Sequence, residues 1–509
     1  MSGQNILRSA AGLTISGIIS KTLDFLFRAY YSTRLGSEGM GIFSLVFSFH
    51  TLILTVATAG LGVAVSKTVS SHYAAREYGC IKKTMQISLI SVIIMSIGVI
   101  APVCIFAKQI ALHFLKEPRT TLSIIYLSPS ILFMSISYCI KGYFYASRKV
   151  AIPAFSEFLE QAVKITLIVF LLKRWLPYGI ERGCQGVFLG ITVGEFSSCL
   201  FLSLFYLRHT GKLKGCTLRH NPLPALLRIA LPAMATSLTG SFLRMREDVL
   251  IVTTLKSSGL DHTSALSQYG TLKGMVMPLI VFPLSLLSSF FTLLVPEISR
   301  AQGMKNNTRL TTLISKIYRF TAFGGFLVCV VFVIFARELS VWVYSAPQIE
   351  QSVRIIALLS PIMFFDSISS GILNGLGKQT TLLTLSLSDS ALRILLIWLL
   401  VPSMGSDALY IMIIISNLFT ATLSFGAVMK NTCMPYELSG WLIRHLITAA
   451  ATFITFRSLT VFFNPDAGFW ATLSAMAFTV GVYLLYGSCL YKTIRRDIGW
   501  LWGRMFYGA

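Results

Sequence analysis

The sequence predicts an all-α polytopic membrane protein with about 14 transmembrane helices. Of the 509 residues, 54% are hydrophobic and only 12% are charged, and the mean hydropathy is +0.72. Apolar stretches of about 20 residues, the length that crosses a hydrocarbon core of roughly 30 Å, recur from one end of the chain to the other. This composition excludes an ordinary soluble globular protein.

The apolar stretches define fourteen expected helices. Charged residues interrupt the first and the seventh, the eighth contains two prolines, and most of the others are nearly uncharged runs. In chain order, the expected helices are 8–31, 40–63, 84–106, 121–140, 151–172, 185–207, 224–255, 268–296, 312–336, 351–373, 379–401, 407–429, 439–462 and 468–490.

The net charge of +23 predicts the orientation in the membrane. A soluble protein with this charge would suggest nucleic acid as a partner, but here the basic residues gather in every second short connection, for example Lys82 and Lys83, then Arg148 and Lys149. The intervening connections carry few bases. The positive-inside rule therefore predicts a multi-pass protein of the cell membrane with both termini in the cytoplasm, and the basic loops are expected to face anionic lipids rather than nucleic acid.

No motif predicts an enzyme, a metal site or a cofactor. The nine cysteines are scattered without CxxC or Cys/His spacing, and the sequence contains no HExxH, GxxxxGK[ST] or GxSxG motif. If the protein transports a substrate, we expect the energy to come from the membrane potential, from a Na⁺ or H⁺ gradient, or from the substrate's own downhill flux. No cleavable signal is evident at the amino terminus, so the first helix is expected to remain.

An internal duplication emerges when the chain is aligned with itself. Two motifs recur with a shift of 232 residues: IIYLSP at 124–129 with IALLSP at 356–361, and SIS at 135–137 with SIS at 367–369. At a shift of 223, Lys21 and Asp24 of the first helix align with Arg244 and Glu247 of the seventh. Each half holds six helices, so the two copies have the same orientation, and parallel repeats of this kind place the substrate path between the halves.

The duplication predicts how the chain is divided. The expected parts are an N-lobe at 1–207 with helices one to six, a cytoplasmic linker at 208–222, a C-lobe at 223–430 with helices seven to twelve, and helices thirteen and fourteen with a cytoplasmic tail at 431–509.

Charges within the first helix are the first functional signal. Lys21, Asp24 and Arg28 are spaced i, i+3 and i+7, which places them on one face of a helix. They are either an ion-pair ladder that neutralises itself or part of a polar cavity, since charges inside membrane helices usually face a bundle interior or water. Two bases against one acid leave a surplus that favours an anionic ligand.

Helix seven repeats this pattern with Arg244, Arg246, Glu247 and Asp248. Arg244 can reach both acids at i+3 and i+4, so internal pairing is one interpretation. The other is recognition of an anionic headgroup, because the planar guanidinium matches two phosphate oxygens at once. We favour Arg244 and Arg246 as phosphate-binding residues.

Helix eight adds one base and two candidate hinge residues. Lys273 stands one turn after Tyr269, and Pro278 and Pro283 lie in the body of the helix. A proline frees a backbone carbonyl and bends the helix, as occurs where transporter helices line a cavity, although a kink that serves packing alone is the alternative.

The remaining intramembrane charges form two similar pairs. Glu160 and Lys164 in helix five have the same i, i+4 spacing as Asp389 and Arg393 in helix eleven. They are interpreted as structural pairs, with proton or ion coupling as the alternative. Two isolated acids, Glu195 and Asp366, are further candidates for a cation site.

Two stretches resemble a known family. The run YGTLKGMVMPLIVFPLSLLSSFFTLLVPEISRA at 269–301 resembles the helix-eight signature of the stage V sporulation protein B branch of polysaccharide transporters. SKTLDFLFRAYYSTRLGSEGMGIFSL at 20–45 is similar to the first helix and turn of that branch. The branch belongs to the MOP (multidrug/oligosaccharidyl-lipid/polysaccharide) flippase superfamily, which also holds the lipid II flippase and the MATE multidrug exporters.

The resemblance implies a fold and a set of site residues. It implies two six-helix lobes in a V shape around a central cavity, and alternating access that carries a polyprenyl-diphosphate-linked sugar to the outer leaflet. By position, the bases that would line the cavity are Lys21, Arg28, Arg244, Arg246 and Lys273. One departure is that Arg28 is followed by alanine here, where the lipid II flippase has an Arg-Asp pair.

The leading hypothesis is therefore a monomeric flippase for a lipid-linked oligosaccharide or peptidoglycan precursor of the cell wall or spore cortex. A cation-coupled multidrug exporter is the rival within transport, supported by Asp24, Glu195, Asp366 and Asp389. A membrane scaffold that recruits cell-wall synthesis proteins through its basic loops is the third hypothesis, but a scaffold does not need matched charges inside helices one and seven.

Overall fold

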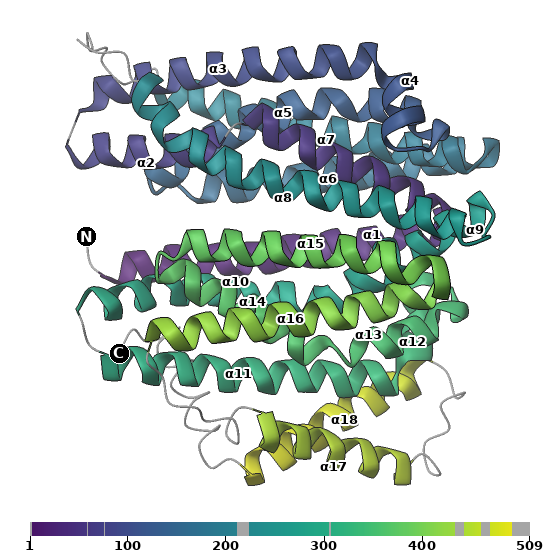
Figure 1. Cartoon of the computed structure of the whole chain (residues 1–509). Coiled ribbons are helices and arrows are strands. Elements are labelled where there is room, and N and C mark those ends of the chain that lie inside the picture. Colours follow the sequence, from purple (N-terminus) through teal and green to yellow (C-terminus); the bar gives the residue numbers. More distant parts are fainter. Residues whose placement is uncertain are drawn as a thin grey trace. The chain divides into compact units, whose positions relative to one another are not determined.

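A computed structural model of the chain is all-helical throughout the residues that it describes (Figure 1). The described residues are 3–58, 60–75, 77–210, 223–304, 307–432, 442–459 and 469–490. Among them, nine helices are long and apolar enough to cross a membrane, and a pair of helices bent by 55° makes a tenth candidate. The all-α membrane class is confirmed, and the expected count of fourteen is consistent with these spans.

Eight α-helices and three short helical turns make up the chain as far as residue 257. In order they are α1 (Gly3–Thr58), α2 (Leu61–Ala74), α3 (Tyr78–Ile105), α4 (Ala107–Gln109), the π-helix η1 (Ile110–Phe114), the 3₁₀ turn η2 (Pro118–Thr120), α5 (Thr121–Ala146), α6 (Ala151–Trp175), the 3₁₀ turn η3 (Leu176–Tyr178), α7 (Ile180–Thr210) and α8 (Leu223–Ser257).

The later elements are again α-helices joined by short π and 3₁₀ segments. They are α9 (His262–Tyr269), the π-helix η4 (Gly270–Val276), α10 (Met277–Gly303), α11 (Asn307–Ile334), α12 (Ala336–Tyr344), the 3₁₀ turn η5 (Pro347–Ile349), α13 (Glu350–Ala357), α14 (Ser360–Gly375), α15 (Gln379–Met404), α16 (Asp407–Thr432), α17 (Arg444–Leu459) and α18 (Phe469–Leu490).

The expected division between the first two helices, 8–31 and 40–63, is present as a kink within α1 at Gly36, with φ 70° and ψ −178°, a conformation that glycine adopts without steric cost. The single helix expected at 268–296 runs without a break through α9, η4 and α10, and the turn shortly before Pro278 is a π-helix.

The chain divides into two compact units, each of which is described by itself. The N-unit comprises Thr22–Gly274 and Ile397–Ser403, and the C-unit comprises Met1–Lys21, Met275–Leu396 and Met404–Ala509. These units do not coincide with the expected lobes, because α8 and α9 pack within the N-unit. The lobe boundaries remain a prediction, and most of the expected linker, 211–222, and the tail, 491–509, lie outside the described residues.

Each unit has an aromatic residue at the centre of its core. In the N-unit, Tyr143 is fully buried among residues of α2, α3, α5, α7 and α8, and its hydroxyl is hydrogen-bonded to His209 at 2.6 Å. In the C-unit, Tyr318 is fully buried and its hydroxyl is 2.8 Å from that of Ser369. The helices α17 and α18 lie side by side and pack on α11 through Phe323 and Tyr483 (Figure 1).

Backbone landmarks confirm the internal duplication. Left-handed residues, 3₁₀ turns and a charged pair recur at a shift of 229 residues: Lys116 with Ser345, η2 with η5, Arg148 with Gly377, and Glu160 and Lys164 with Asp389 and Arg393. This shift is three residues smaller than that of the IIYLSP motif, so the aligned prolines, Pro129 and Pro361, stand almost one helical turn apart in the repeat. The duplication is real, but the proline match does not mark equivalent positions.

The closest helix contact in the N-unit depends on glycine. A Cβ at Gly270 would lie 1.9 Å from the carbonyl oxygen of Ser37 and 2.4 Å from the nitrogen of Gly41. One turn further, a Cβ at Gly274 would lie 2.7 Å from the Cβ of Met40. The backbone of α1 after its kink therefore runs directly against the end of α9 and the start of η4, where no side chain fits between them.

We expect Gly270→Ala to destabilise the protein by about 1–3 kcal/mol, because the added methyl group meets backbone atoms that cannot move aside. Thermal unfolding of the purified protein in detergent measures this. Gly98→Ala is the matched control, because a Cβ at Gly98 has no atom within 4 Å. Equal midpoints for the two variants would contradict the tight contact.

Candidate functional site

A charged cluster joins α1, α8 and η4 inside the N-unit. The Lys273 ammonium lies 2.8 Å from a carboxylate oxygen of Glu247 and 3.2 Å from one of Asp248. The other oxygen of Asp248 accepts a hydrogen bond from the Ser48 hydroxyl of α1. Glu247 and Asp248 are both buried. Since buried carboxylates require a paired cation, Lys273 holds the acidic side of α8 in place.

Arg28 completes this cluster from the first segment of α1. Its guanidinium lies 3.5 Å from the carbonyl oxygen of Lys273 and stacks over the Phe43 ring at 5.8 Å. Pro278 has no N–H, so the carbonyl five residues before it, that of Lys273, cannot receive the bond that would continue the π pattern. Arg28 supplies a donor to that oxygen, and so α1 and η4 are linked at this point.

Arg244 and Arg246 are placed differently from the acids that follow them. Both arginines are exposed, and Arg244 donates a 3.3 Å hydrogen bond to the Ser241 hydroxyl rather than pairing with Glu247 or Asp248. No ion pair of Arg246 is found in the part of the chain that the structure describes. The internal pairing considered for this helix is therefore absent here, and the positive charge of both arginines is not neutralised by their own helix.

The charges of the first helix also find partners on other elements. Lys21 donates a 2.7 Å hydrogen bond to the carbonyl oxygen of Ser285 in the C-unit. Asp24, in the N-unit, lies 3.2 Å from the ammonium of Lys164 in α6. Lys21 and Asp24 share a helix face, but Asp24 pairs with Lys164 on another helix. The charges of this helix therefore do not form a ladder that neutralises itself.

The two pairs related by the repeat behave differently. In the C-unit, Arg393 lies 3.0 Å from Asp389, and that carboxylate also accepts hydrogen bonds from Ser416 and Thr420 of α16. Asp366 accepts a 2.9 Å hydrogen bond from Ser424 of the same helix. In the N-unit, Lys164 pairs with Asp24 instead of Glu160.

Glu160 instead lies near Glu195, a buried acid of α7. Lys141 of α5 pairs with the neighbouring acid Glu157 at 3.1 Å. Glu157, Glu160 and Glu195 thus lie in one cluster with Lys141 and Lys164, in which Glu195 is buried and the other four are half-buried. The spacing of Glu160 and Lys164 alone did not predict this cluster.

A second ion-pair network was not predicted from the sequence. Arg119, in the turn that opens α5, lies 2.6 Å from Glu38 of α1 and 2.9 Å from Glu117. Glu117 is also 2.7 Å from the imidazole Nε2 of His262, the first residue of α9. We call these four residues the α1–α9 network. Their partners lie on other elements, so no spacing within one helix predicts these pairs.

Two acids near this network have lowered pKa values. Burial alone would raise the pKa of Glu117, but hydrogen bonds from Arg119 and the positive charges of Arg119 and His262 outweigh it, and the net pKa is lowered. Hydrogen bonds from Ser264 and Thr263 lower the pKa of Asp261 to about 2. Asp261 caps the amino terminus of α9 by accepting the Ser264 N–H at 3.2 Å, so both acids stay ionised near neutral pH.

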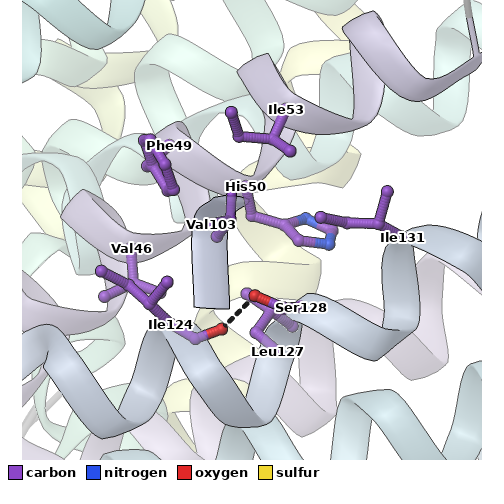
Figure 2. A pocket seen from close by; sticks show the side chains of 9 residues that line it. All are labelled: Val46, Phe49, His50, Ile53, Val103, Ile124, Leu127, Ser128 and Ile131. Carbon is purple, nitrogen blue, oxygen red and sulfur yellow. Dashed lines mark hydrogen bonds between the residues drawn. The ribbon is translucent and has the colours of Figure 1, made fainter. Parts of the chain in front are cut away.

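Figure 2 shows a small apolar pocket in the N-unit, formed by α1, α3 and α5. Among its lining residues are Phe49, His50 and Leu127, and the Ser128 hydroxyl donates to the Ile124 carbonyl at 2.6 Å. The His50 imidazole is hydrogen-bonded to Ser130 at 2.8 Å. The lining residues include no lysine or arginine, so this pocket does not suit a diphosphate.

The chain is similar to known proteins in both sequence and fold. The sequence model of the family described as polysaccharide biosynthesis protein matches residues 6–302. Stage V sporulation protein B of Bacillus subtilis (strain 168) is 26% identical over 452 residues, which cover 86% of this chain and 87% of that relative. Solved structures are also similar in fold, and two of them are described here.

The structure of the lipid II flippase MurJ in an inward closed conformation has a TM-score of 0.72 and 15% identity, and covers 95% of this chain and 99% of that one. An inward-facing multidrug resistance MATE family transporter of the MOP superfamily has a TM-score of 0.65 and 17% identity, and covers 83% of this chain and 98% of that one. These similarities confirm the expected MATE-like fold class.

Replacing Lys273 by methionine should destabilise the protein by about 3–5 kcal/mol, because it leaves two buried carboxylates without their cation. Denaturant unfolding of the purified protein measures the loss. The triple variant Lys273→Met/Glu247→Gln/Asp248→Asn should recover most of it. Lys173→Met, at an exposed position near the end of α6, is the control. A loss that the triple variant does not reduce would argue against the cluster.

Glu117→Gln should reduce stability at pH 7 but have a smaller effect in acid. The lowered pKa means that the ionised carboxylate stabilises the folded protein above its unfolded pKa of about 4.3, and that this contribution disappears as the pH falls through the lower folded pKa. Thermal unfolding of both proteins from pH 7 to pH 3 measures the difference. A difference that stays constant over this range would show that ionisation of Glu117 is not responsible.

Proposed function

Because this chain belongs to the polysaccharide biosynthesis protein family, we propose that it is a flippase for a lipid-linked oligosaccharide or peptidoglycan precursor. The proposed substrate is a sugar carried on a polyprenyl diphosphate, which the protein moves from the inner to the outer leaflet of the cell membrane. The similarity to stage V sporulation protein B and the shared fold with a lipid II flippase support this class of substrate.

The observation that carries the proposal is the exposure of Arg244 and Arg246 in the body of α8. Arg244 is 13 residues, or roughly 20 Å, from the end of that helix at Ser257. An arginine facing lipid at such depth is costly, so exposed arginines there are expected to face a water-filled path. The buried acids next to them are already neutralised by Lys273. Both guanidinium groups therefore remain available to a diphosphate.

The other proposed substrate-binding residues are Lys21, Arg28 and Lys273. Lys21 and Arg28 each contact a backbone carbonyl, which offsets part of the cost of burial. Lys273 is committed to Glu247 and Asp248, so we propose that its first role is to position α8. Contact with the substrate then falls mainly to the arginines.

Transport would proceed by alternating access of two repeat-related lobes. Pro278 and Pro283 are the proposed hinge residues, and Pro278 directly follows the π-helix η4, in which the boundary between the compact units falls. The proposed energy source is the membrane potential or a Na⁺ or H⁺ gradient. We propose that the protein acts as a monomer with both termini in the cytoplasm, as the basic loops predict.

Three of the four acids that would favour a multidrug exporter have a basic or hydroxyl partner, and the fourth, Glu195, is buried. Asp24 pairs with Lys164, Asp389 with Arg393, and Asp366 with the Ser424 hydroxyl. A site for a cationic drug would need carboxylates that are open to it, and of these four acids only Asp24 is exposed, next to the Lys164 ammonium. The distribution of charge therefore favours an anionic substrate over a cationic one.

The double substitution Arg244→Ala/Arg246→Ala should slow transport about tenfold or more, since a hydrogen bond to a charged group contributes roughly 1.5–3 kcal/mol. The measurement is leaflet translocation of a fluorescent polyprenyl-diphosphate-linked disaccharide in proteoliposomes with an applied membrane potential. Both arginines are exposed, so the thermal unfolding midpoint should hardly change.

Lys173→Ala/Arg174→Ala is the control, because it also removes two adjacent exposed bases, at the end of α6. Equal transport by both double variants would reject a diphosphate site on α8. Transport of a cationic dye but not of the lipid-linked sugar by the wild type would support the exporter instead.

A further inference from the structure

Three side chains of types that bind transition metals meet at the turn between α2 and α3. They are His72 in the last turn of α2, Glu77 directly before α3, and Cys80 in the first turn of α3. An imidazole nitrogen, a carboxylate oxygen and the Cys80 Sγ all lie within 4.8 Å of one another. In the part of the chain that the structure describes, this is the one group of three such residues that meets this condition.

The backbone of the turn fixes these three residues relative to one another. The Glu77 N–H donates a 2.9 Å hydrogen bond to the His72 carbonyl oxygen, and the Cys80 N–H donates one of 3.1 Å to the Glu77 carbonyl oxygen. Each residue is thus tied to the next through the main chain. Ligands that are held in this way lose little conformational freedom when they bind, which favours binding.

The Glu77 carboxylate is directed toward His72 rather than toward its own helix. A carboxylate at the start of a helix is favoured there by the unpaired N–H groups of the first turn. Glu77 makes no side-chain hydrogen bond to that turn of α3. Its Oε2 lies 2.8 Å from Nδ1 of His72 instead. The carboxylate and the imidazole therefore already face each other, with the Cys80 Sγ within reach of both.

We propose that His72, Glu77 and Cys80 bind one Zn²⁺ ion, which links the end of α2 to the start of α3. Imidazole nitrogen, carboxylate oxygen and thiolate sulfur are the donors that Zn²⁺ uses in proteins, at about 2.0–2.3 Å. In a tetrahedral site these lengths place the donor atoms roughly 3.4–3.6 Å apart, so no pair has to close by more than about 1.4 Å from its present separation. Rotation of side chains can supply a movement of this size.

The charges of the three donors suit a divalent cation. A carboxylate and a thiolate together carry two negative charges and a neutral imidazole adds none, so the bound ion forms an uncharged complex. The thiolate and the imidazole favour Zn²⁺ over Mg²⁺ and Ca²⁺, which prefer oxygen donors. Three protein ligands leave the fourth tetrahedral position to a water molecule.

The turn lies where a reduced thiol is expected. It leads into the bases Lys82 and Lys83, so the positive-inside rule predicts that it faces the cytoplasm, where thiols stay reduced. The side chains of His72 and Glu77 are 20% and 53% exposed, whereas Cys80 is only 7% exposed. The ion can therefore enter from water past the two exposed ligands and reach a sulfur that is shielded from solvent.

Cobalt binding to the purified full-length protein tests the site. Co²⁺ accepts the same ligands as Zn²⁺ but absorbs visible light, and a thiolate ligand adds a sulfur-to-cobalt charge-transfer band. The protein in detergent is treated with a chelator and then titrated with Co²⁺. We expect one ion per chain, the charge-transfer band, and loss of both when Zn²⁺ is added. The site goes beyond the proposed function, and this measurement needs no transport.

Single substitutions assign the ligands. Loss of even an outer partner of a metal ligand costs about 10–100-fold in affinity, so Cys80→Ser, Glu77→Gln and His72→Gln should each weaken Zn²⁺ binding about 100-fold or more in competition with a coloured chelator. Cys80→Ser should also abolish the charge-transfer band. Cys104→Ser in α3 and His113→Gln in η1 are the controls, because they remove the same types of side chain elsewhere and should bind as the wild type does.

Thermal unfolding separates loss of the site from loss of the fold. Without metal, Glu77→Gln should unfold at the wild-type midpoint, because an ion pair of a largely exposed side chain contributes little. Zn²⁺ should raise the midpoint of the wild type and of Cys104→Ser, but not that of Glu77→Gln. A cobalt spectrum without the sulfur band in the wild type, or equal Zn²⁺ affinities of Cys80→Ser and Cys104→Ser, overturns the site.

Discussion

The arrangement of the N-unit depends on the close approach of two backbones at Gly41 and Gly270. Because no side chain separates α1 from the end of α9, the first turn of η4 is held within reach of both segments of α1. Lys273, three residues after Gly270, then stands between Arg28 and the acids of α8. A steric constraint at two glycines thereby fixes the position of the charges around which the proposed site is built.

The acids of α8 are buried and its two neighbouring arginines are exposed. Glu247 and Asp248 face inward and are satisfied by residues of η4 and α1, whereas Arg244 and Arg246 remain exposed. The helix therefore presents an excess of positive charge although its sequence holds as many acids as bases in this stretch. Neutralisation of the acids by a distant lysine is what gives α8 its electropositive face.

The amino-acid sequence predicted the features that depend on local pattern. Hydropathy predicted the helical membrane class, and the spacing of Asp389 and Arg393 predicted an ion pair that forms within one helix. It did not predict that Lys164 would pair with Asp24, 140 residues away, because helix periodicity defines a face but not the element that covers it. The same limit applies to Arg119 and His262, whose partners lie on other elements, and to the π-helix before Pro278, since hydropathy does not distinguish π from α geometry.

A change of the π-helix η4 to α geometry would rotate the helix that follows it. Its hydrogen bonds span five residues instead of four, so a return to α geometry would shift the register by one residue and turn all that follows by roughly 100° about the helix axis. Gly274 and Met275, between which the compact units divide, both lie in this segment. A change confined to one turn of backbone can therefore reorient the whole of α10 without breaking a hydrogen bond inside that helix.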